Sequence, residues 1–280
     1  MFALRPICRI SRRFGDYRTD GYFCKSQPGE ETHGIQRGRK KHHGVKSKGI
    51  ILAGGEGTRL HPLTLTVNKH LLTVGDRPMI VYPCRTLREL GIDEIMIVSG
   101  ARWVSQLREA ALSDSPSDMI TVETAVQHRS DGIVGALRIA REFAEGCPIA
   151  VILGDNLFQS VPKEARAFFA NPQGAMIFLA TVADASEFGV ATLVDGKVTS
   201  IVEKSPTPSS NSIVTGLYLY DSTAFARIEN INPSQRGEYE ITDLNNSYLR
   251  DGALRHAFVE SSWLDCGTHD SLKRAHELLT

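Results

Sequence analysis

The stretch KGIILAGGEGTRL, residues 48–60, joins a short apolar run to a loop that is rich in glycine. We expect Lys48–Ala53 to form a buried strand, because a short apolar run that ends in glycines is typical of a strand in a sheet covered on both faces. The glycines let the loop turn sharply and expose backbone N–H groups that can cradle phosphate oxygens. Arg59, at the far end of the loop, can offer a cationic fork to a triphosphate.

Two common phosphate-binding motifs do not fit this loop. A Walker loop would need Gly-Lys followed by Ser or Thr at its end. A dinucleotide fingerprint, G-x-G-x-x-G, could begin at Gly55 and Gly57, but Leu60 occupies the place of the third glycine. Tight turns use the same residues, so the loop alone leaves phosphate binding and a plain turn as open alternatives.

From residue 48 to residue 173, segments of strand character alternate with segments of helical spacing. We expect further strands at Glu94–Ser99, Ile120–Val126 and Ile149–Leu153. We expect helices at Pro78–Leu90, Val104–Leu112 and Ile133–Phe143. This alternation predicts an α/β fold, with a Rossmann-like, mostly parallel twisted sheet and helices on both of its faces.

After residue 173 the pattern changes to short strands separated by turns such as Asp195-Gly196. The expected strands are Ala175–Val182, Val190–Val194, Val198–Glu203, Ile213–Tyr220 and Leu254–Val259, with a helix at Ile241–Leu249. We interpret residues 48–280 as one domain, with a nucleotide-binding half at residues 48–173 and a smaller, β-rich half at residues 174–280.

Charge is spread unevenly along the chain. Residues 1–48 hold twelve of the 32 Lys and Arg but only four of the 32 Asp and Glu, so the remainder is acidic. We expect residues 1–47 to form a basic, disordered extension. Residues 1–18 loosely resemble a transit peptide, and the basic run could contact an anionic surface. The interpretation we favour is a tail without a part in catalysis.

Composition narrows the class of protein. The sequence lacks an apolar run of the ~18–20 residues that a membrane-spanning helix needs. The acidic body disfavours non-specific nucleic-acid binding, so any nucleotide should bind in a defined pocket, and we expect no membrane or specific nucleic-acid partner. Five scattered cysteines without a CxxC pair fit a reducing, cytoplasmic location: Cys8, Cys24, Cys84, Cys147 and Cys266.

Beyond the loop, the sequence resembles the sugar nucleotidylyltransferase family. The family signature G-G-x-G-T-R-L-x-P-L-T is matched at Gly54–Thr64, while Asn68–Leu72 and Asp76–Ile80 are similar to the family's S-K-x-L-L-P and D-K-P-M-I. Similar segments then follow in the family's order: Gln127, Asp131-Gly132, Leu153–Asn156, Glu203-Lys204, Thr215–Tyr218, Arg236–Glu238, Glu240–Asp243 and Trp263–Thr268. The resemblance covers about residues 48–280 and implies the nucleotide-diphospho-sugar transferase fold, with residues 174–280 as the sugar-binding half.

Within the family, the sequence is most similar to glucose-1-phosphate thymidylyltransferases. This implies transfer of a nucleotidyl group, from dTTP above all, to glucose 1-phosphate, giving dTDP-glucose and pyrophosphate. Such a transfer depends mainly on positioning and on stabilising the charge that builds on the phosphates. The residues that match the family's catalytic cations are Arg59, Lys69 and Lys204.

The resemblance also implies which residues bind each substrate. Those expected at the nucleotide are Leu52, Gly54, Gly55, Gly57, Thr58, Gln127, Gly132 and Asp155. Those expected at the sugar phosphate are Asn156, Gly189, Glu203, Lys204, Thr215, Gly216 and Arg236. The Gln127 amide offers a donor and an acceptor, which suits the imide edge of thymine or uracil. We expect Trp263 to be a packing wall.

Asp155 and Asp265 are the expected ligands of a magnesium ion. Asp155 follows an apolar strand, at the edge where ligands bind in open α/β sheets. A lone aspartate there could equally cap a helix, but two carboxylates with phosphate oxygens suit Mg²⁺. The pair is similar to the metal pair of the family.

The sequence also allows other functions. The same chemistry could use another nucleotide, such as UTP, or another sugar 1-phosphate. A regulatory subunit could bind nucleotide sugars without turnover, although such a protein would be expected to lack some of the phosphate- and metal-binding residues. A nucleic-acid binder would rest on the basic extension alone. A homo-oligomer is compatible with each of these functions.

Overall fold

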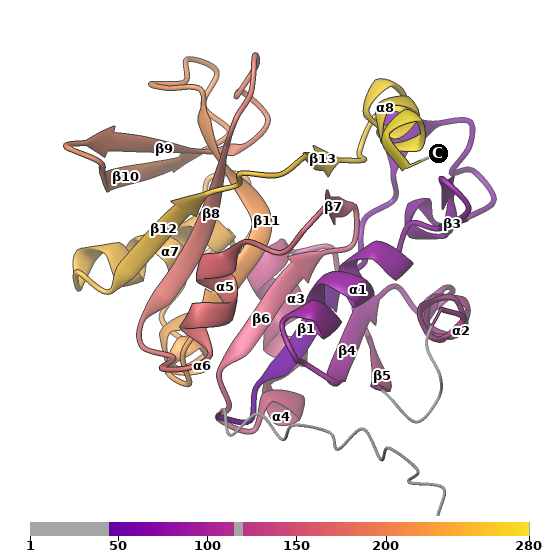
Figure 1. Ribbon diagram of the computed structural model, residues 1–280, viewed down its shortest axis with the longest axis horizontal. Coiled ribbons are helices and arrows are strands. Elements are labelled where there is room, and N and C mark those ends of the chain that lie inside the picture. Colours follow the sequence, from indigo (N-terminus) through magenta and orange to yellow (C-terminus); the bar gives the residue numbers. More distant parts are fainter. Residues whose placement is uncertain (1–44, 115–119, 280) are drawn as a thin grey trace, which may run out of the picture. The chain divides into compact units, whose positions relative to one another are not determined.

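The computed structural model of the protein describes residues 45–114 and 120–279. Its main feature is a nine-stranded, mostly parallel sheet in the order β10-β9-β11-β6-β1-β4-β5, with β8 and β12 joined beside β11 (Figure 1). The parallel strands of the first half are β1 (Lys48–Leu52), β4 (Glu94–Ser99), β5 (Thr121–Val126) and β6 (Ile149–Leu153). The expected basic extension lies outside the described residues, apart from residues 45–47.

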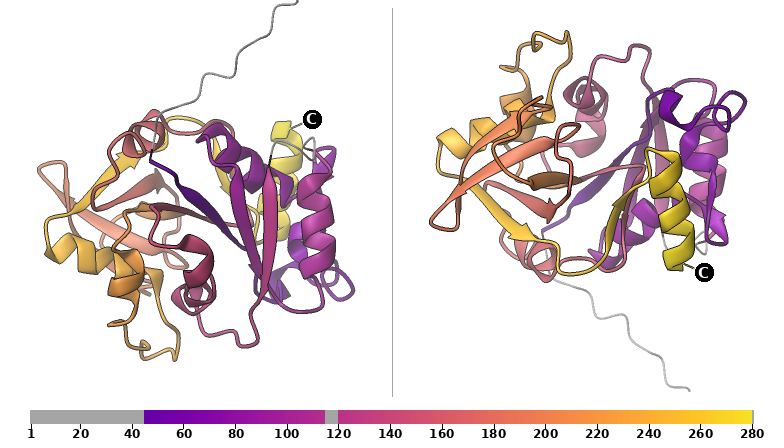
Figure 2. Two further views of the ribbon diagram at one scale, coloured as in Figure 1. Left: turned by 90° about the horizontal axis from the view of Figure 1, so that it is seen from below. Right: turned by 90° about the horizontal axis from the view of Figure 1, so that it is seen from above.

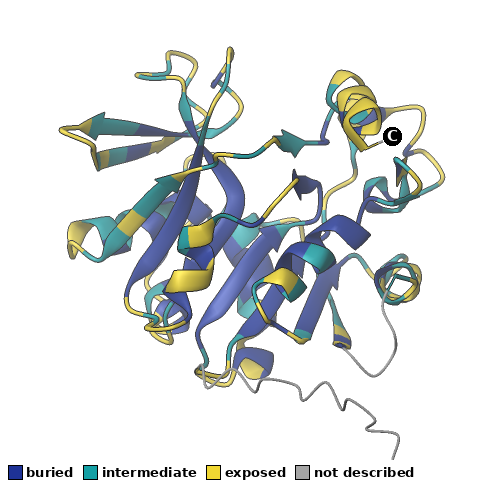
Figure 3. Cartoon of the chain, in the orientation of Figure 1, coloured by how far each residue is buried: buried dark blue, intermediate teal, exposed yellow. Residues whose placement is uncertain are grey.

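Helices cover both faces of this sheet. Successive side chains of β1 point to opposite faces, so they pack in two different cores. Ile50 and Leu52 pack in a core with α3 (Ile133–Ile139), α4 (Arg141–Ala144), α6 (Ala224–Ile228) and α7 (Ile241–Arg250). Ile51 packs in a second core with α1 (Val81–Glu89), α2 (Val104–Leu112) and α5 (Lys163–Phe168). Figure 3 shows the central strands in dark blue, as buried. The expected α/β architecture is therefore confirmed.

The second half joins the sheet through β11 (Ser212–Tyr220), which is antiparallel to β6. Its other strands are β8 (Ala175–Thr181), β9 (Gly189–Val194), β10 (Lys197–Glu203) and β12 (Leu254–Phe258). The pairing of β11 with β8 is irregular, since Val214 lies opposite Leu179 but Tyr218 lies opposite Ile177. Strand β11 thus holds two more residues than its partner at this point.

The last part of the chain returns to the first half. Strand β13 (Trp263–Asp265) pairs antiparallel with β7 (Asn156–Phe158), and helix α8 (His269–Leu279) follows it. In both views of Figure 2 the yellow helix α8 lies among the purple segments of the early chain. His276 Nδ1 of this helix accepts a hydrogen bond from the backbone N–H of Gly75 at 3.2 Å. Within the described ranges, every helix is too short or too polar to cross a membrane.

Several boundaries differ from those expected from the sequence. Helix α1 begins at Val81 rather than Pro78, because Arg77-Pro78 forms a short strand, β3, that pairs with β2 (Thr73–Val74). The helix expected at Ile133–Phe143 is two helices, α3 and α4, separated at Ala140. The short elements α5, α6, β7, β13 and the helix α8 were not expected.

Two glycines of the second half have left-handed backbones but differ in how closely other atoms surround them. Gly174 has φ of 69°, and a Cβ there would lie 2.1 Å from the Ala253 carbonyl oxygen. Gly196 has φ of 71° but open space around it. We expect Gly196→Ala to lower the free energy of unfolding by about 1 kcal/mol, and Gly174→Ala to lower it by about 3 kcal/mol or more, since backbone must also move. Equal losses in urea denaturation would contradict this packing.

Candidate active site

The side chains expected to bind substrates gather at the carboxyl ends of β1 and β6, where open α/β sheets bind ligands. A cavity of about 300 Å³ lies there. Its lining includes most of the expected residues from both halves of the domain: Leu52, Gly54, Gly55, Arg59, Lys69, Gln127, Gly132, Asp155, Asn156, Gly189, Glu203, Lys204, Gly216 and Asp265. One cavity thus brings together residues expected at the nucleotide and residues expected at the sugar phosphate.

Three further expected residues stand outside this lining. Gly57 has φ of 66°, and its carbonyl oxygen accepts a hydrogen bond from the Thr64 hydroxyl at 2.7 Å, so it shapes the loop. Thr58 is exposed at the start of a short 3-10 turn, Thr58–Leu60. Thr215 is buried in β11, and its hydroxyl lacks a hydrogen-bond partner.

Arg236 also stands outside the lining, although we expected it at the sugar phosphate. Its guanidinium lies 3.2 Å from the carboxylate of Glu238 and 3.4 Å from that of Glu240. Both glutamates line the cavity. Arg236 is therefore paired at the margin of the cavity and would have to leave these carboxylates to reach a ligand inside it.

The glycine-rich loop approaches the end of β5 closely. A Cβ at Gly54 would lie 2.7 Å from the side-chain oxygen of Gln127. Gln127 follows β5, and its backbone N–H donates to Ser99 O at 2.8 Å. Gly54 therefore leaves room for the Gln127 amide beside the loop, a contact that the sequence did not predict.

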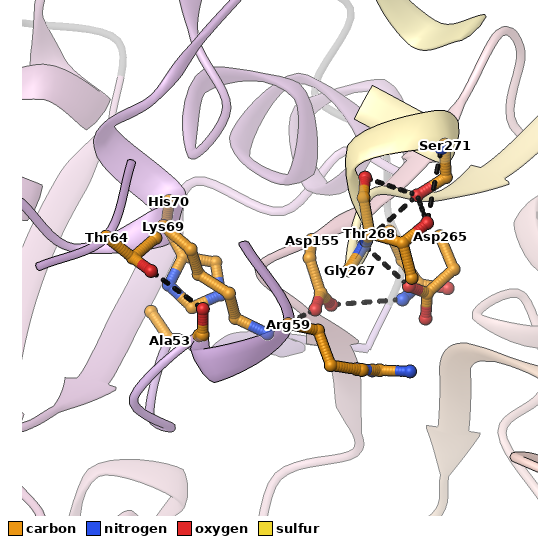
Figure 4. A network of polar contacts seen from close by, with 12 residues as sticks. Ala53, Arg59, Thr64, Lys69, His70, Asp155, Asp265, Gly267, Thr268 and Ser271 are labelled. Carbon is orange, nitrogen blue, oxygen red and sulfur yellow. Dashed lines mark hydrogen bonds and ion pairs between the residues drawn. The ribbon is translucent and has the colours of Figure 1, made fainter. Parts of the chain in front are cut away.

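Lys69 and Asp155 form a buried ion pair below this loop (Figure 4). Lys69 Nζ lies 2.5 Å from Asp155 Oδ2, and the two side chains are 15% and 10% exposed. Lys69 begins a 3-10 turn whose Asn68 cap accepts a hydrogen bond from the backbone N–H of His70 at 2.9 Å. Burial raises the pKa of Asp155, but the charges of Lys69 and His70 and the hydrogen bonds from Lys69 and Asn156 together outweigh it and hold this pKa below its usual range.

Asp265 brings a second carboxylate to the same place. Figure 4 shows Asp155 between Lys69 and Asp265. Burial, and then the charge of Asp155, raise the pKa of Asp265 to about 6. Asp265 Oδ1 accepts a hydrogen bond from the backbone N–H of Gly267 at 2.9 Å, and the Cys266 N–H donates to Asp155 O at 2.8 Å. Two carboxylates of this kind, one buried and one partly buried, repel each other unless a cation lies near both.

The donor chemistry of the two carboxylates fits a hard divalent cation such as Mg²⁺. Across the described ranges there is no group of three or more His, Cys, Asp or Glu side chains that could hold a metal without other ligands. Phosphate oxygens would have to complete such a site. The cavity lining also carries more acidic than basic side chains, with Asp155, Glu187, Glu203, Glu238, Glu240 and Asp265 against Arg59, Lys69 and Lys204.

The opposite end of the cavity is formed by the second half of the domain. The Thr242 hydroxyl donates a hydrogen bond to the carboxylate of Glu203. Lys204 has an unusual left-handed backbone, with φ of 42°, and its N–H donates to Phe188 O at 3.0 Å. A strained non-glycine residue in a cavity is a frequent mark of a functional site. The Phe188 and Trp263 rings, 6.2 Å apart, add an aromatic wall.

Several lining residues were not singled out as site residues from the sequence. They are His70, Tyr218, Glu187, Glu238, Glu240, Thr242 and Asn245. Thr242 and Asn245 are three positions apart on α7 and so share a face of the helix, which is a signal that the sequence contains. Glu187 lies in a turn before β9, and the sequence around it does not predict that its side chain faces the cavity.

Residues 48–280 match the model of a protein family described as nucleotidyl transferase. A curated glucose-1-phosphate thymidylyltransferase from Xanthomonas campestris pv. campestris (strain B100) is 43% identical over 236 residues, which cover 82% of this chain and 80% of the relative. A protein of the same name from Neisseria meningitidis is 40% identical over 233 residues, or 81% of each chain.

Solved structures of nucleotide-sugar enzymes are also similar to this chain. A crystal structure from Bacillus anthracis, assigned as a glucose-1-phosphate thymidylyltransferase in complex with a sucrose, has a TM-score of 0.78 and 41% identity, and covers 83% of this chain and 95% of that chain. A UDP-glucose pyrophosphorylase complexed with UDP-glucose has a TM-score of 0.71 at 22% identity, and covers 83% and 97% of the two chains. At that identity the similarity concerns the fold alone.

The Lys69 ammonium should stabilise the fold in the absence of ligands. Lys69→Met leaves the Asp155 charge buried beside Asp265, so we expect a loss of about 3–5 kcal/mol in the free energy of unfolding. Most of it should return in the double variant Lys69→Met/Asp155→Asn. Lys163→Met, which removes an exposed ion pair with Glu260, should cost less than about 1 kcal/mol. Urea denaturation in EDTA compares the four proteins, and a Lys69→Met variant as stable as Lys163→Met would contradict the expectation.

Proposed function

The chain belongs to the nucleotidyl transferase family, and on that premise we propose that it transfers a thymidylyl group from dTTP to glucose 1-phosphate, giving dTDP-glucose and pyrophosphate. The observation that carries this proposal is the ion pair of Lys69 with Asp155, beside Asp265 and below a glycine-rich loop, in a cavity lined by both halves of the domain. The curated relatives of this name, which match along about four-fifths of the chain, support the choice of substrates.

In the proposed reaction, a phosphate oxygen of glucose 1-phosphate attacks the α-phosphorus of dTTP. A new oxygen–phosphorus bond forms as the bond to the β-phosphate oxygen breaks, and the electron pair leaves with pyrophosphate. Loop N–H groups and Arg59 hold the triphosphate, and Lys69 and Lys204 offset charge on the reacting phosphates. The chain thus contributes mainly by bringing two anions together, and a covalent enzyme intermediate is not required.

We propose that Asp155 and Asp265 hold Mg²⁺ together with phosphate oxygens. When bound, the ion supplies charge neutralisation and a template for the triphosphate. The acidic excess in the cavity lining supports this role, because three basic side chains face six acidic ones before any substrate enters. Two anionic substrates would meet strong repulsion in such a cavity without a divalent cation.

For base recognition, we propose that the Gln127 amide contacts the imide edge shared by thymine and uracil. UTP therefore remains the alternative nucleotide. The likeness to a UDP-glucose pyrophosphorylase does not favour UTP, because it concerns the fold alone. The names of the curated relatives favour dTTP.

A regulatory subunit without turnover is the second candidate. Only the fold supports this candidate. The enzyme is favoured because the expected catalytic cations and both carboxylates line one cavity: Arg59, Lys69, Lys204, Asp155 and Asp265. Such a subunit would bind ligands without making product, so the same experiment separates the two candidates.

The direct test is release of pyrophosphate from dTTP and from UTP, each with glucose 1-phosphate and Mg²⁺. We expect release with dTTP that EDTA abolishes, and a fall of about 100-fold or more in Asp155→Asn, since one carboxylate of the cation site is lost. Asp195→Asn, in the β9–β10 turn, is the matched control and should keep its activity. Binding of dTTP without any pyrophosphate would favour the regulatory subunit.

Replacement of Gln127 tests base recognition separately. Gln127→Ala removes the amide and leaves Asp155 and Asp265 unchanged, so we expect kcat/KM for dTTP to fall about 10- to 100-fold. The loss with UTP should be similar, because the two bases share the imide edge. A variant that loses activity with one nucleotide only would contradict this contact. His128→Ala, at the exposed neighbouring position, serves as the control.

A further inference from the structure

Asn156 lines the cavity, yet its hydrogen bonds all lead back to the protein. The residue is 1% exposed and begins strand β7. Its Oδ1 accepts hydrogen bonds from Trp263 Nε1 at 2.8 Å and from the Gly216 N–H at 2.9 Å. Its Nδ2 donates to Asp155 Oδ1 at 3.2 Å.

From the sequence we expected Asn156 to contact the sugar phosphate. We propose instead that Asn156 is a positioning residue, which fixes the cation-binding carboxylate of Asp155 relative to the sugar-side wall at Trp263. This inference rests on the proposed function, because it concerns how the same site is built. Both lone pairs of the amide oxygen are used by protein donors, so the oxygen has no capacity left for a sugar hydroxyl.

The backbone around Asn156 already joins the two carboxylates. Asn156 lies opposite Asp265 in the β7–β13 ladder, and the Cys266 N–H donates to Asp155 O at 2.8 Å. The ladder sets where the two aspartates leave the backbone, but it does not set the rotation of the Asp155 side chain. The hydrogen bond from Asn156 Nδ2 supplies that constraint on one oxygen, while Lys69 takes the other.

Gly216 explains why the amide can reach across to β11. A Cβ at Gly216 would lie 2.6 Å from Asn156 Cγ, so the amide occupies the space that a side chain would fill. Gly216 lies where β11 holds two residues more than β8, which frees its N–H from the strand ladder for the amide oxygen. Asn156 thereby connects β7, β11 and β13 at one point.

Groups that orient a metal ligand without touching the metal commonly change metal affinity 10- to 100-fold when they are removed. For Asn156→Ala we therefore expect about a tenfold weaker affinity for Mn²⁺, used as the probe for the Mg²⁺ site. The KM for glucose 1-phosphate at saturating Mg²⁺ should change much less. A direct sugar contact would give the opposite pattern.

The experiment uses the full chain and measures Mn²⁺ binding by electron paramagnetic resonance with dTTP present, whose phosphate oxygens complete the site, and without glucose 1-phosphate. The ¹H–¹⁵N spectrum adds a second readout, since the chain has two tryptophans and thus two indole N–H signals. Asn156→Ala should shift the Trp263 signal and leave that of Trp103 in place. Asn246→Ala, which removes an amide hydrogen bond of 2.9 Å to Ile201 O outside the cavity, is the matched control and should change neither readout.

Trp263→Phe keeps an aromatic wall and deletes one donor to the amide, so it tests the link even if Asn156→Ala does not fold. We expect it to weaken Mn²⁺ binding about two- to threefold. Unchanged Mn²⁺ affinity in Trp263→Phe, or in a folded Asn156→Ala, would overturn the positioning role and leave the proposed reaction intact. Failure of the wild-type chain to bind Mn²⁺ in the presence of dTTP would overturn the inference and also the proposed cation site, whereas the indole shift would still report the hydrogen bond.

Discussion

Two carboxylates, Asp155 and Asp265, lie close together in a cavity where burial disfavours their charges, and the Lys69 ammonium partly offsets them. Much of the site follows from this constraint. The carboxylates must be held by the backbone because they repel each other, and the turn that carries Lys69 must be fixed beside them. A divalent cation would offset the negative charge that the protein alone leaves in the cavity, and phosphate oxygens would complete its ligand set.

The fold meets this constraint by bringing distant parts of the chain together. Strand β6 leads directly into Asp155, and β13 returns from the end of the chain to place Asp265 beside it. Helix α8 then packs against the turn between β2 and β3, so the late segment is held at both of its ends. The cation site therefore depends on the docking of a segment far from the glycine-rich loop in sequence.

The sequence predicts the long elements well, because apolar runs such as Ile149–Leu153 are buried on both faces and leave a clear pattern. It does not predict β7 and β13, whose three residues each are too few for a periodicity and which form only by pairing with each other. Most expected site residues line the cavity, since they flank strand ends. Arg236 does not, because it pairs with Glu238 and Glu240, and in a segment without helix or strand the sequence does not show which neighbours a side chain will pair with.

The irregular pairing of β11 has a consequence for how the fold can change. Side chains alternate between faces with a period of two, so an excess of two residues keeps Val214 and Tyr218 in the same core on either side of the irregularity. An excess of one residue would have required a local change of backbone angles to keep the same face buried. Insertions or deletions of two residues at this point would therefore change the β11 wall of the cavity while the two cores keep their membership.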